Sequence, residues 1–448
     1  MSARTSLSDK KLQKTLARAG RAQARFARRY PGDSGARQPV HTVYGGAHLF
    51  SSDTAPKLGE LALRSLEKYA PDAHAFGEAI GIPGELAPKV YDRVRAKLAR
   101  EPVEDFRIDF EDGYGNRSDE EEDGHAVAAA KQVAAGMVAN TLPPFLGIRI
   151  KPLTGELAGR SLRTLDVFLT ELLANTNGSL PANFVVTLPK IQSQAHVEML
   201  VDTFEQLEDR LDIEHGALRV EFMVETTQSI LDPQGRAVLT RLHRAAGDRL
   251  TGAHFGTYDY TAGCDITAAH QRMRHPACDF AKQMMKVAFA GTGVMLSDGA
   301  TNIMPVGPHR GDHLTDEQQR ANRAAVFAAW RLQADDIRHS LVNGFYQGWD
   351  LHPAQLPTRY GAVYAFFLDG LAPASERLRN FVDKAAQATL VGDVFDDAAT
   401  GQGLLNYFLR GIACGAVTEQ EALTTGLTIE EIRAKSFVKI MAARRAKA

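Results

Sequence analysis

The feature that most constrains the fold is an alternation of strand-like and helix-like segments across residues 39–357. Eight short segments carry the pattern of strands, and helical patterns separate nearly all of them. This alternation predicts a parallel α/β architecture, and eight strands favour a (β/α)8 TIM barrel over an open doubly wound sheet. No G-x-G-x-x-G motif follows a strand, so a dinucleotide-binding fold has no support. The strand candidates are centred near Thr42, Phe106, Leu146, Val185, Val220, Ala253, Val294 and Tyr346.

Two acids follow strand candidates that are consecutive in the chain. Apolar and polar residues alternate with a period of two in residues 219–225, and this strand ends at Glu225. A second short strand leads into a Gly-Thr-Tyr-Asp loop that ends at Asp259. A loop and a helix separate the strands, so we expect parallel neighbours whose terminal carboxylates lie at one edge of the sheet. Two converging carboxylates favour a site for Mg²⁺ or Mn²⁺; the alternative is a pair of unrelated acids that cap helices.

Two other strand candidates carry charged residues on one face. In residues 105–111 the aromatic and aliphatic side chains alternate with charged ones that include Asp109 and Glu111, and the next strand repeats this pattern with Arg149. In a barrel the apolar face would pack under the helices, and the charged face would point inward at the mouth, where ligands bind. An edge strand that shows its charge to water is the alternative. For Arg149, a purely structural ion pair with Asp109 or Glu111 also remains open.

Other polar residues near the strands carry weaker signals. Lys190 follows the fourth strand, and its position suits a functional or a structural role. Asp298 fits a turn after the seventh strand, and His352 fits a structural role in the eighth loop. The alternation of Arg219 and Glu221 predicts a buried polar pair deep in the barrel.

The sequence pattern divides the chain into three parts. Residues 1–39 form a basic helical leader, residues 40–357 form the barrel, and residues 358–448 form a helical extension. We expect the leader to pack on the barrel or on a neighbouring subunit, with a transit peptide or an anion-binding arm as alternatives. The extension could be a cap on the same barrel, a lid or an oligomerisation arm. The basic residues of the leader helix are Lys10, Lys11, Lys14, Arg18, Arg21, Arg25, Arg28 and Arg29.

Composition narrows the functional class. The 448 residues carry a net charge of -2, which gives no global reason to expect nucleic acid or an anionic membrane as a partner. The three cysteines lack the spacing of a zinc site or of a disulfide framework, so a reducing compartment is expected. No apolar run reaches membrane-spanning length, and no signal-peptide core follows Met1. We therefore expect a cytoplasmic protein with neither nucleic-acid nor membrane partners.

Six short motifs occur in an order that resembles the HpcH/HpaI aldolase and citrate lyase family, in its citrate lyase beta-subunit-like branch. Each motif is weak alone, but together they span most of the chain at barrel-unit spacing. Malate synthases share this kind of barrel, and G-T-Y-D-Y here looks like their G-R-W-D-Y. The motifs are D-F-E-D-G at 109–113, R-I-K-P at 149–152, L-P-K at 188–190, V-E-T at 224–226, G-T-Y-D at 256–259 and G-W-D-L-H-P-A-Q at 348–355.

The resemblance implies a TIM barrel in which Glu225 and Asp259 hold Mg²⁺ (or Mn²⁺) and Arg149 contacts the reacting carbonyl. It implies reversible carbon–carbon cleavage or condensation of a hydroxy or oxo acid, or of its CoA thioester, and we expect a homo-oligomer. The family's R-x-N-P asparagine is replaced by Lys151, which would put a charge in or beside the pocket. Alternatives are a malate-synthase-like condensing enzyme, an acyl-CoA thioesterase and a non-catalytic assembly subunit that kept the barrel.

Residue chemistry assigns roles within this expected site. An arginine offers a fixed fork of donors where an enolate oxygen gains charge, and a carboxylate can accept the hydroxyl proton. The acids after the second strand would hold metal-bound waters. The expected catalytic residues are Arg149, Asp109 and Glu111, the expected substrate-binding residues are Arg149, Lys190, Asp112, Gly256 and Thr257, and the expected metal ligands are Glu225 and Asp259.

Overall fold

Eight parallel strands close into a barrel in the order β1 to β8, with β1 also pairing with β8. The structure is a computed structural model that describes residues 6, 8–32, 36–383, 389–391, 394–396, 398–434, 436–437, 440 and 443–444. The closed barrel confirms the predicted (β/α)8 fold. The strands are β1 His41–Gly46, β2 Asp105–Asp109, β3 Phe145–Arg149, β4 Phe184–Leu188, β5 Val220–Val224, β6 Leu250–Phe255, β7 Met295–Ala300 and β8 Gln347–Asp350.

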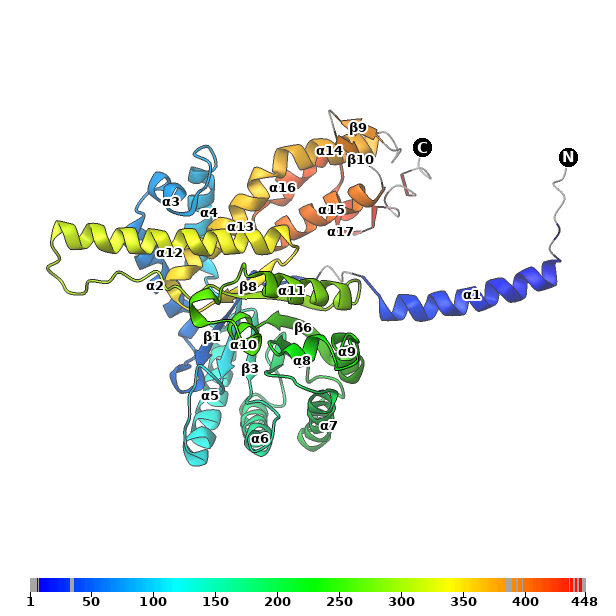
Figure 1. Cartoon of the computed structure of the whole chain (residues 1–448), viewed down its shortest axis with the longest axis horizontal. Helices are drawn as coiled ribbons and strands as arrows, with labels where there is room; N and C mark the ends of the chain where they lie inside the picture. The colour runs from blue at the N-terminus through cyan, green and yellow to red at the C-terminus, as the bar shows by residue number, and fades with distance from the viewer. Residues whose placement is uncertain are drawn as a thin grey trace.

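Helices surround the barrel and connect its strands (Figure 1). Local sequence explains two of the helix starts: Ser118 forms a capping box with Glu121 at the start of α5, and Thr315 forms one with Gln318 at the start of α12. The helices of the barrel are α2 Thr54–Tyr69, α3 Ala73–Ile80, α4 Ala87–Arg100, α5 Asp119–Ala139, α6 Leu157–Asn175, α7 Gln194–Leu211, α8 Thr227–Ile230, α9 Leu239–Ala246, α10 Thr257–Gly263, α11 Pro276–Phe289 and α12 Asp316–Val342.

Strand β2 shows how side-chain parity positions charged groups inside the barrel. Phe106 and Ile108 are buried in the hydrophobic core between strands and helices. Arg107 and Asp109 alternate with them, so they point to the inner face, where both are almost completely buried. Charged residues therefore occupy the barrel interior, as the alternation predicted.

The segment after β8 packs on the barrel through α13, Leu356–Asp369, which is buried along almost its whole length. Arg359 on α13 donates to Asp350 at the end of β8, which anchors this helix to the strand. The remaining elements are α14 Leu371–Asp383, β9 Thr389–Val391, β10 Val394–Asp396, α15 Ala398–Ala413, α16 Glu419–Ala422 and α17 Ile429–Arg433. The antiparallel pair β9–β10 departs from the purely helical extension that the sequence predicts.

The basic leader forms one long helix, α1, Asp9–Arg29, which projects away from the barrel (Figure 1). Residues 10–29 are all exposed, and the chain returns to the barrel from Tyr30, which is partly buried. The expectation that α1 packs on its own barrel is therefore wrong; packing on a neighbouring subunit stays a prediction. In the part of the chain that the structure describes, no helix is long and apolar enough to cross a membrane.

Candidate active site

Asp109 and Arg149 form the base of the candidate site. They pair in register at the carboxyl ends of β2 and β3. The Arg149 guanidinium donates from Nε to Asp109 Oδ1 at 2.7 Å and from Nη2 to Oδ2 at 2.5 Å. The backbone N–H groups of Glu111 and Gly113 donate to the same carboxylate at 3.0 and 2.7 Å. Since four donors saturate Asp109, its geometry suits holding Arg149 and the loop after β2 in place.

Glu111 lies between two cations at the mouth. Its Oε2 is 3.1 Å from Nη1 of Arg149, and its other oxygen forms an ion pair with Lys190 Nζ. Burial raises the pKa of Glu111, although Arg149 and Lys190 oppose that rise. Glu111 is therefore a partly desolvated carboxyl group whose pKa lies above its ordinary value.

Lys190 reaches this point because its backbone takes a left-handed conformation just after β4, with φ at 48°. Non-glycine residues adopt that conformation at some cost, and it turns the lysine toward the mouth. Its Nζ lies 3.0 Å from Asp112 Oδ2 and 3.8 Å from Asp259 Oδ2. Burial alone would lower the pKa of Lys190, but Glu111 and the other nearby acids raise it, so the side chain stays an ammonium ion.

Glu225 and Asp259 come from neighbouring parallel strands, as predicted. Glu225 directly follows β5 and is buried, and Asp259 lies in the first turn of α10, just after β6. The backbone N–H of Lys190 donates to Glu225 Oε1 at 2.7 Å. Burial and then the nearby Asp259 carboxylate raise the pKa of Glu225 to about 8. The two acids are therefore close enough for the charge of one to affect the pKa of the other.

This pair suits a hard cation. Its carboxylates repel each other in a partly dry site, so a divalent ion between them would relieve the repulsion that raises the pKa of Glu225. Among the described residues, no group of three or more His, Cys, Asp or Glu side chains is arranged to hold a metal ion. An ion held by Glu225 and Asp259 would therefore take its other ligands from water and substrate, as Mg²⁺ does in many enzymes.

The other expected substrate contacts differ in how they face the site. Asp112 lies at the rim with 60% of its side chain exposed; burial tends to raise its pKa, but its hydrogen bond from Lys190 brings the pKa below the ordinary value. Gly256 packs so tightly on Glu225 that a Cβ there would come within 2.5 Å of its side chain. The Thr257 hydroxyl donates to Met273 Sδ at 3.3 Å and is turned into the protein. Any contact of Thr257 with substrate would therefore come from its backbone.

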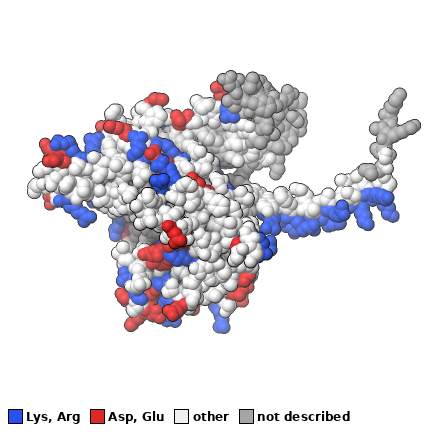
Figure 2. Space-filling model, viewed as in Figure 1, with Lys and Arg blue, Asp and Glu red and all other residues white. Residues whose placement is uncertain are grey.

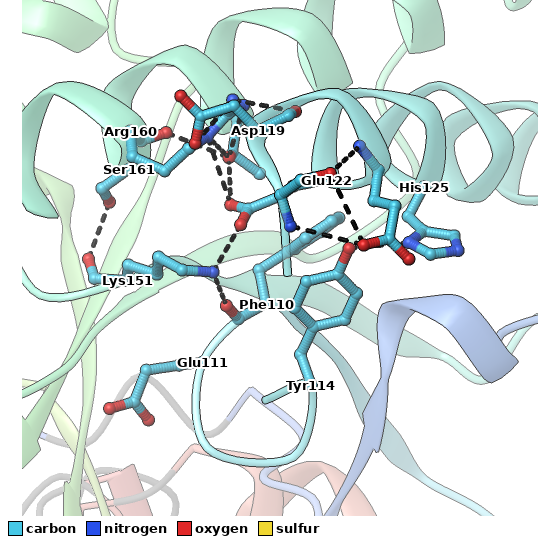
Figure 3. A network of polar contacts seen from close by, with 12 residues as sticks. Phe110, Glu111, Tyr114, Asp119, Glu122, His125, Lys151, Arg160 and Ser161 are labelled. Carbon is cyan, nitrogen blue, oxygen red and sulfur yellow. Dashed lines mark hydrogen bonds and ion pairs between the residues drawn. The ribbon is translucent and has the colours of Figure 1, made fainter. Parts of the chain in front are cut away.

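Lys151 lies beside the candidate site, one of the two positions expected from the sequence, and its charge there is paired. Its Nζ donates to Phe110 O at 2.7 Å and pairs with Glu122 Oε2 at 2.6 Å. Figure 3 shows Lys151 extended toward Glu122 on α5, with Glu111 apart from this network. Thr164 donates to the other Glu122 oxygen at 2.5 Å. A buried acid from the adjacent helix thus neutralises the lysine.

The structure also adds residues that the sequence did not single out. Tyr44 on β1 lies under Arg149, whose Cζ is 4.8 Å from the ring centroid. Deeper in the barrel, Glu221 pairs with Arg107 and with His254. The expected pair of Arg219 and Glu221 is wrong, because Arg219 is exposed and bonds to a backbone carbonyl outside the barrel. The alternation of side chains along β1 could have predicted that Tyr44 faces the barrel interior. The partner of Glu221 could not be predicted in this way, because it depends on how the barrel closes.

Asp298 and His352 take structural positions. Asp298 lies within β7, so the expectation of a turn after that strand is wrong. Its side chain is buried and accepts hydrogen bonds from Lys282 at 3.1 Å and Ser340 at 2.6 Å. His352 accepts from the backbone of Ala354 at 3.1 Å and so caps the turn after β8. Among the residues that the structure describes, neither side chain forms a hydrogen bond with the acids at the mouth.

A cavity of about 440 Å³ lies at the opposite end of the barrel. It is lined by residues at the amino ends of the strands, such as Phe145, Phe184 and Met295, and its floor includes Arg107 and Glu221. Catalytic groups of TIM barrels lie at the carboxyl ends of the strands, and here the converging acids lie at that end. The cavity is therefore separate from the candidate site.

Comparison with solved structures finds similar chains, of which the citrate lyase, with a TM-score above 0.5, supports the fold. The barrel is similar to a citrate lyase from Burkholderia xenovorans, with a TM-score of 0.55 and 19% identity over 87% of this chain and 97% of that one. A malate synthase from Haloferax volcanii has a TM-score of 0.45 and 12% identity over 86% and 96% of the two chains. An HpcH/HpaI aldolase/citrate lyase family protein from Burkholderia cenocepacia has a TM-score of 0.39 and 12% identity over 76% and 95%.

Comparisons of sequence give one match. No curated protein matches the chain. One family model covers residues 19–440, which include the whole barrel, about half of α1 and most of the C-terminal extension. The chain therefore belongs to the family described as a domain of unknown function, DUF6986.

Proposed function

We propose that this chain is a Mg²⁺-dependent carbon–carbon lyase that cleaves or forms a hydroxy acid or its CoA thioester. The observation that carries the proposal is the convergence at the barrel mouth of the acids Glu225 and Asp259 with Arg149, Glu111 and Lys190. The order of sequence motifs that resembles the HpcH/HpaI and citrate lyase family supports the same reaction class.

The arrangement supplies the groups that such a cleavage needs. When bound to Glu225 and Asp259, Mg²⁺ would act as a Lewis acid on the oxo-acid fragment. Arg149, held in orientation by Asp109, presents Nη1 toward the mouth, where it can donate to the oxygen that gains charge. Glu111, with its raised pKa, is placed to accept the proton of the substrate hydroxyl.

In the resting site these charges pair with one another. Lys190 contacts Glu111 and Asp112, so an incoming carboxylate can take over part of the lysine's charge. Asp112 at the rim is placed to orient water or substrate polar groups. A malate-synthase-like condensation would use the same residues in the reverse direction. A thioesterase or a non-catalytic assembly subunit would not need an arginine whose guanidinium is held in a fixed orientation by Asp109.

The experiment compares Mg²⁺ binding and turnover in two variants of the full chain. Glu225→Gln should abolish the calorimetric Mg²⁺ signal and the conversion of hydroxy acids, free or as CoA thioesters, followed by mass spectrometry. Glu85→Gln, an exposed acid on the loop before α4, is the matched control and should leave both unchanged. If Glu225→Gln still binds Mg²⁺, the proposed metal site is wrong. If the native protein binds Mg²⁺ but converts none of these substrates, the lyase assignment is wrong.

A further inference from the structure

The helix α1 carries a continuous cationic stripe. Its basic residues at 10, 14, 18, 21, 25 and 28 repeat every three or four positions, and with Lys11 and Arg29 they fall within an arc of about 100°. Figure 2 shows Lys and Arg side chains along one edge of this helix. All eight are exposed, and none forms an ion pair with a residue that the structure describes. A stripe of this kind is suited to an anionic partner.

Charge is divided unevenly between the leader and the rest of the chain. Residues 1–39 hold ten Lys or Arg against two Asp, so with a net charge of -2 overall the remaining 409 residues carry -10. The body of the protein is therefore itself an anionic surface of the kind that α1 needs. A body with this charge would also repel a polyanion brought close by α1.

The outer face of α7 carries an acidic stripe that matches α1. Glu198, Asp202, Glu205 and Asp209 repeat with spacings of four, three and four residues, which place them within an arc of about 60°. All four are exposed, and no Lys or Arg of the described chain pairs with them. The two stripes share one period, so their side chains can interdigitate when the helices lie side by side.

We propose that α1 of one copy docks along α7 of a second copy of this chain. The helix leaves its own barrel at Tyr30 and projects away from it, so its whole length can reach a neighbouring copy (Figure 1). The opposite face of α1 holds only Leu12, Leu16 and Phe26 as large apolar residues, which is sparse for insertion into a lipid surface. Reciprocal exchange of arms gives a closed two-fold dimer.

The test uses two charge-reversed variants of the full-length protein. The arm variant changes Lys14, Arg18, Arg21 and Arg25 to Glu, and the α7 variant changes Glu198, Asp202, Glu205 and Asp209 to Lys. In sedimentation velocity at low salt, the native protein should associate, and its dissociation constant should rise steeply with salt. In each variant alone the dissociation constant should rise about tenfold or more, so the monomer should predominate at concentrations where the native protein associates. An equimolar mixture of the two variants should associate again, because each then offers what the other lost.

Matched controls separate this contact from its competitors. Reversing four exposed acids elsewhere, at Glu60, Glu85, Glu317 and Glu376, should leave association intact, and circular dichroism should show every variant folded. A mixture that stays monomeric, as it would if α1 folded back on its own α7, overturns the proposal. So does loss of association on Leu16→Ser with Phe26→Ser while both charge reversals are tolerated. It is also overturned if the arm variant loses binding to duplex DNA, or to phosphatidylserine vesicles, with its assembly unchanged.

Discussion

Asp109 shows how one carboxylate fixes the geometry of the mouth. It accepts two hydrogen bonds from Arg149 and two from the loop that carries Glu111, so the cation and the acid move as one unit. Alternation along two strands was enough to predict that these residues meet. It was not enough to predict the partner of Lys151, because Glu122 comes from a helix whose rotation about the barrel no strand pattern reveals.

Replacing Arg149 with lysine tests the planar fork. Arg149→Lys keeps the positive charge but loses the fixed pair of donors that Asp109 aligns, so turnover should fall by roughly 10²–10³. Mg²⁺ affinity should barely change, because the guanidinium contacts Asp109 and Glu111 rather than the Glu225–Asp259 pair. Steady-state kinetics measure the turnover, and calorimetric titration with Mg²⁺ measures the affinity. Nearly normal turnover would show that Arg149 is only structural.

Lys151 tests a buried ion pair beside the site. Lys151→Met removes the nearer of the two cations that pair with the buried Glu122 carboxylate and leaves it only Arg160, whose Nε lies 3.5 Å from Oε1. Unfolding in urea should show a loss of up to about 3 kcal/mol, since the remaining pair only partly compensates the buried charge. The double variant Lys151→Met with Glu122→Leu should recover most of that loss. If the single variant unfolds at the native midpoint, Lys151 and Glu122 are not coupled.

At the scale of elements, strand parity and the order of strands and helices carried most of what could be predicted. The eight strands, their parallel pairing and the inward charges of β2 follow from short-range periodicity. The pair β9–β10 did not, because three-residue strands are too short to show a period. The free position of α1 could not be predicted either, since an amphipathic pattern does not say which surface it faces.

The junction between the leader and α4 predicts a dependence on pH. Burial tends to raise the pKa of Glu101, but hydrogen bonds from Arg37 and Lys97 outweigh it and lower the pKa from 4.5 to about 2. Because the folded-state pKa is depressed, this contact contributes stability above pH 4.5 and loses it as the pH falls toward 2. Glu101→Gln should therefore lower the urea midpoint at pH 7, and the difference from native should shrink as the pH falls through that window. A difference that is constant with pH would assign the effect to packing.

At the scale of the whole molecule, α1 and the barrel are separate in structure. Deleting residues 1–29 should leave the melting temperature and the activity per barrel unchanged at about 1 M salt, where exposed charges are screened, because no described side chain of α1 is buried. Calorimetry measures the first quantity and initial rates the second. Arg37→Ala, which removes a contact to α4, is the comparison and should lower the melting temperature. A truncated protein that melts several degrees lower would show that α1 stabilises the barrel directly.

The point at which α1 joins the barrel has a further consequence. The N–H of Gly32 donates to Gly291 O at 2.8 Å, just before β7, so the arm is rooted at the end of the barrel away from the converging acids. With 21 residues, the arm is about 31 Å long. Subunits joined through this arm would contact one another at the amino ends of the strands and along the outer helices. The mouth of each barrel would then face solvent. Assembly through α1 would therefore leave the path by which substrate diffuses into each barrel unobstructed.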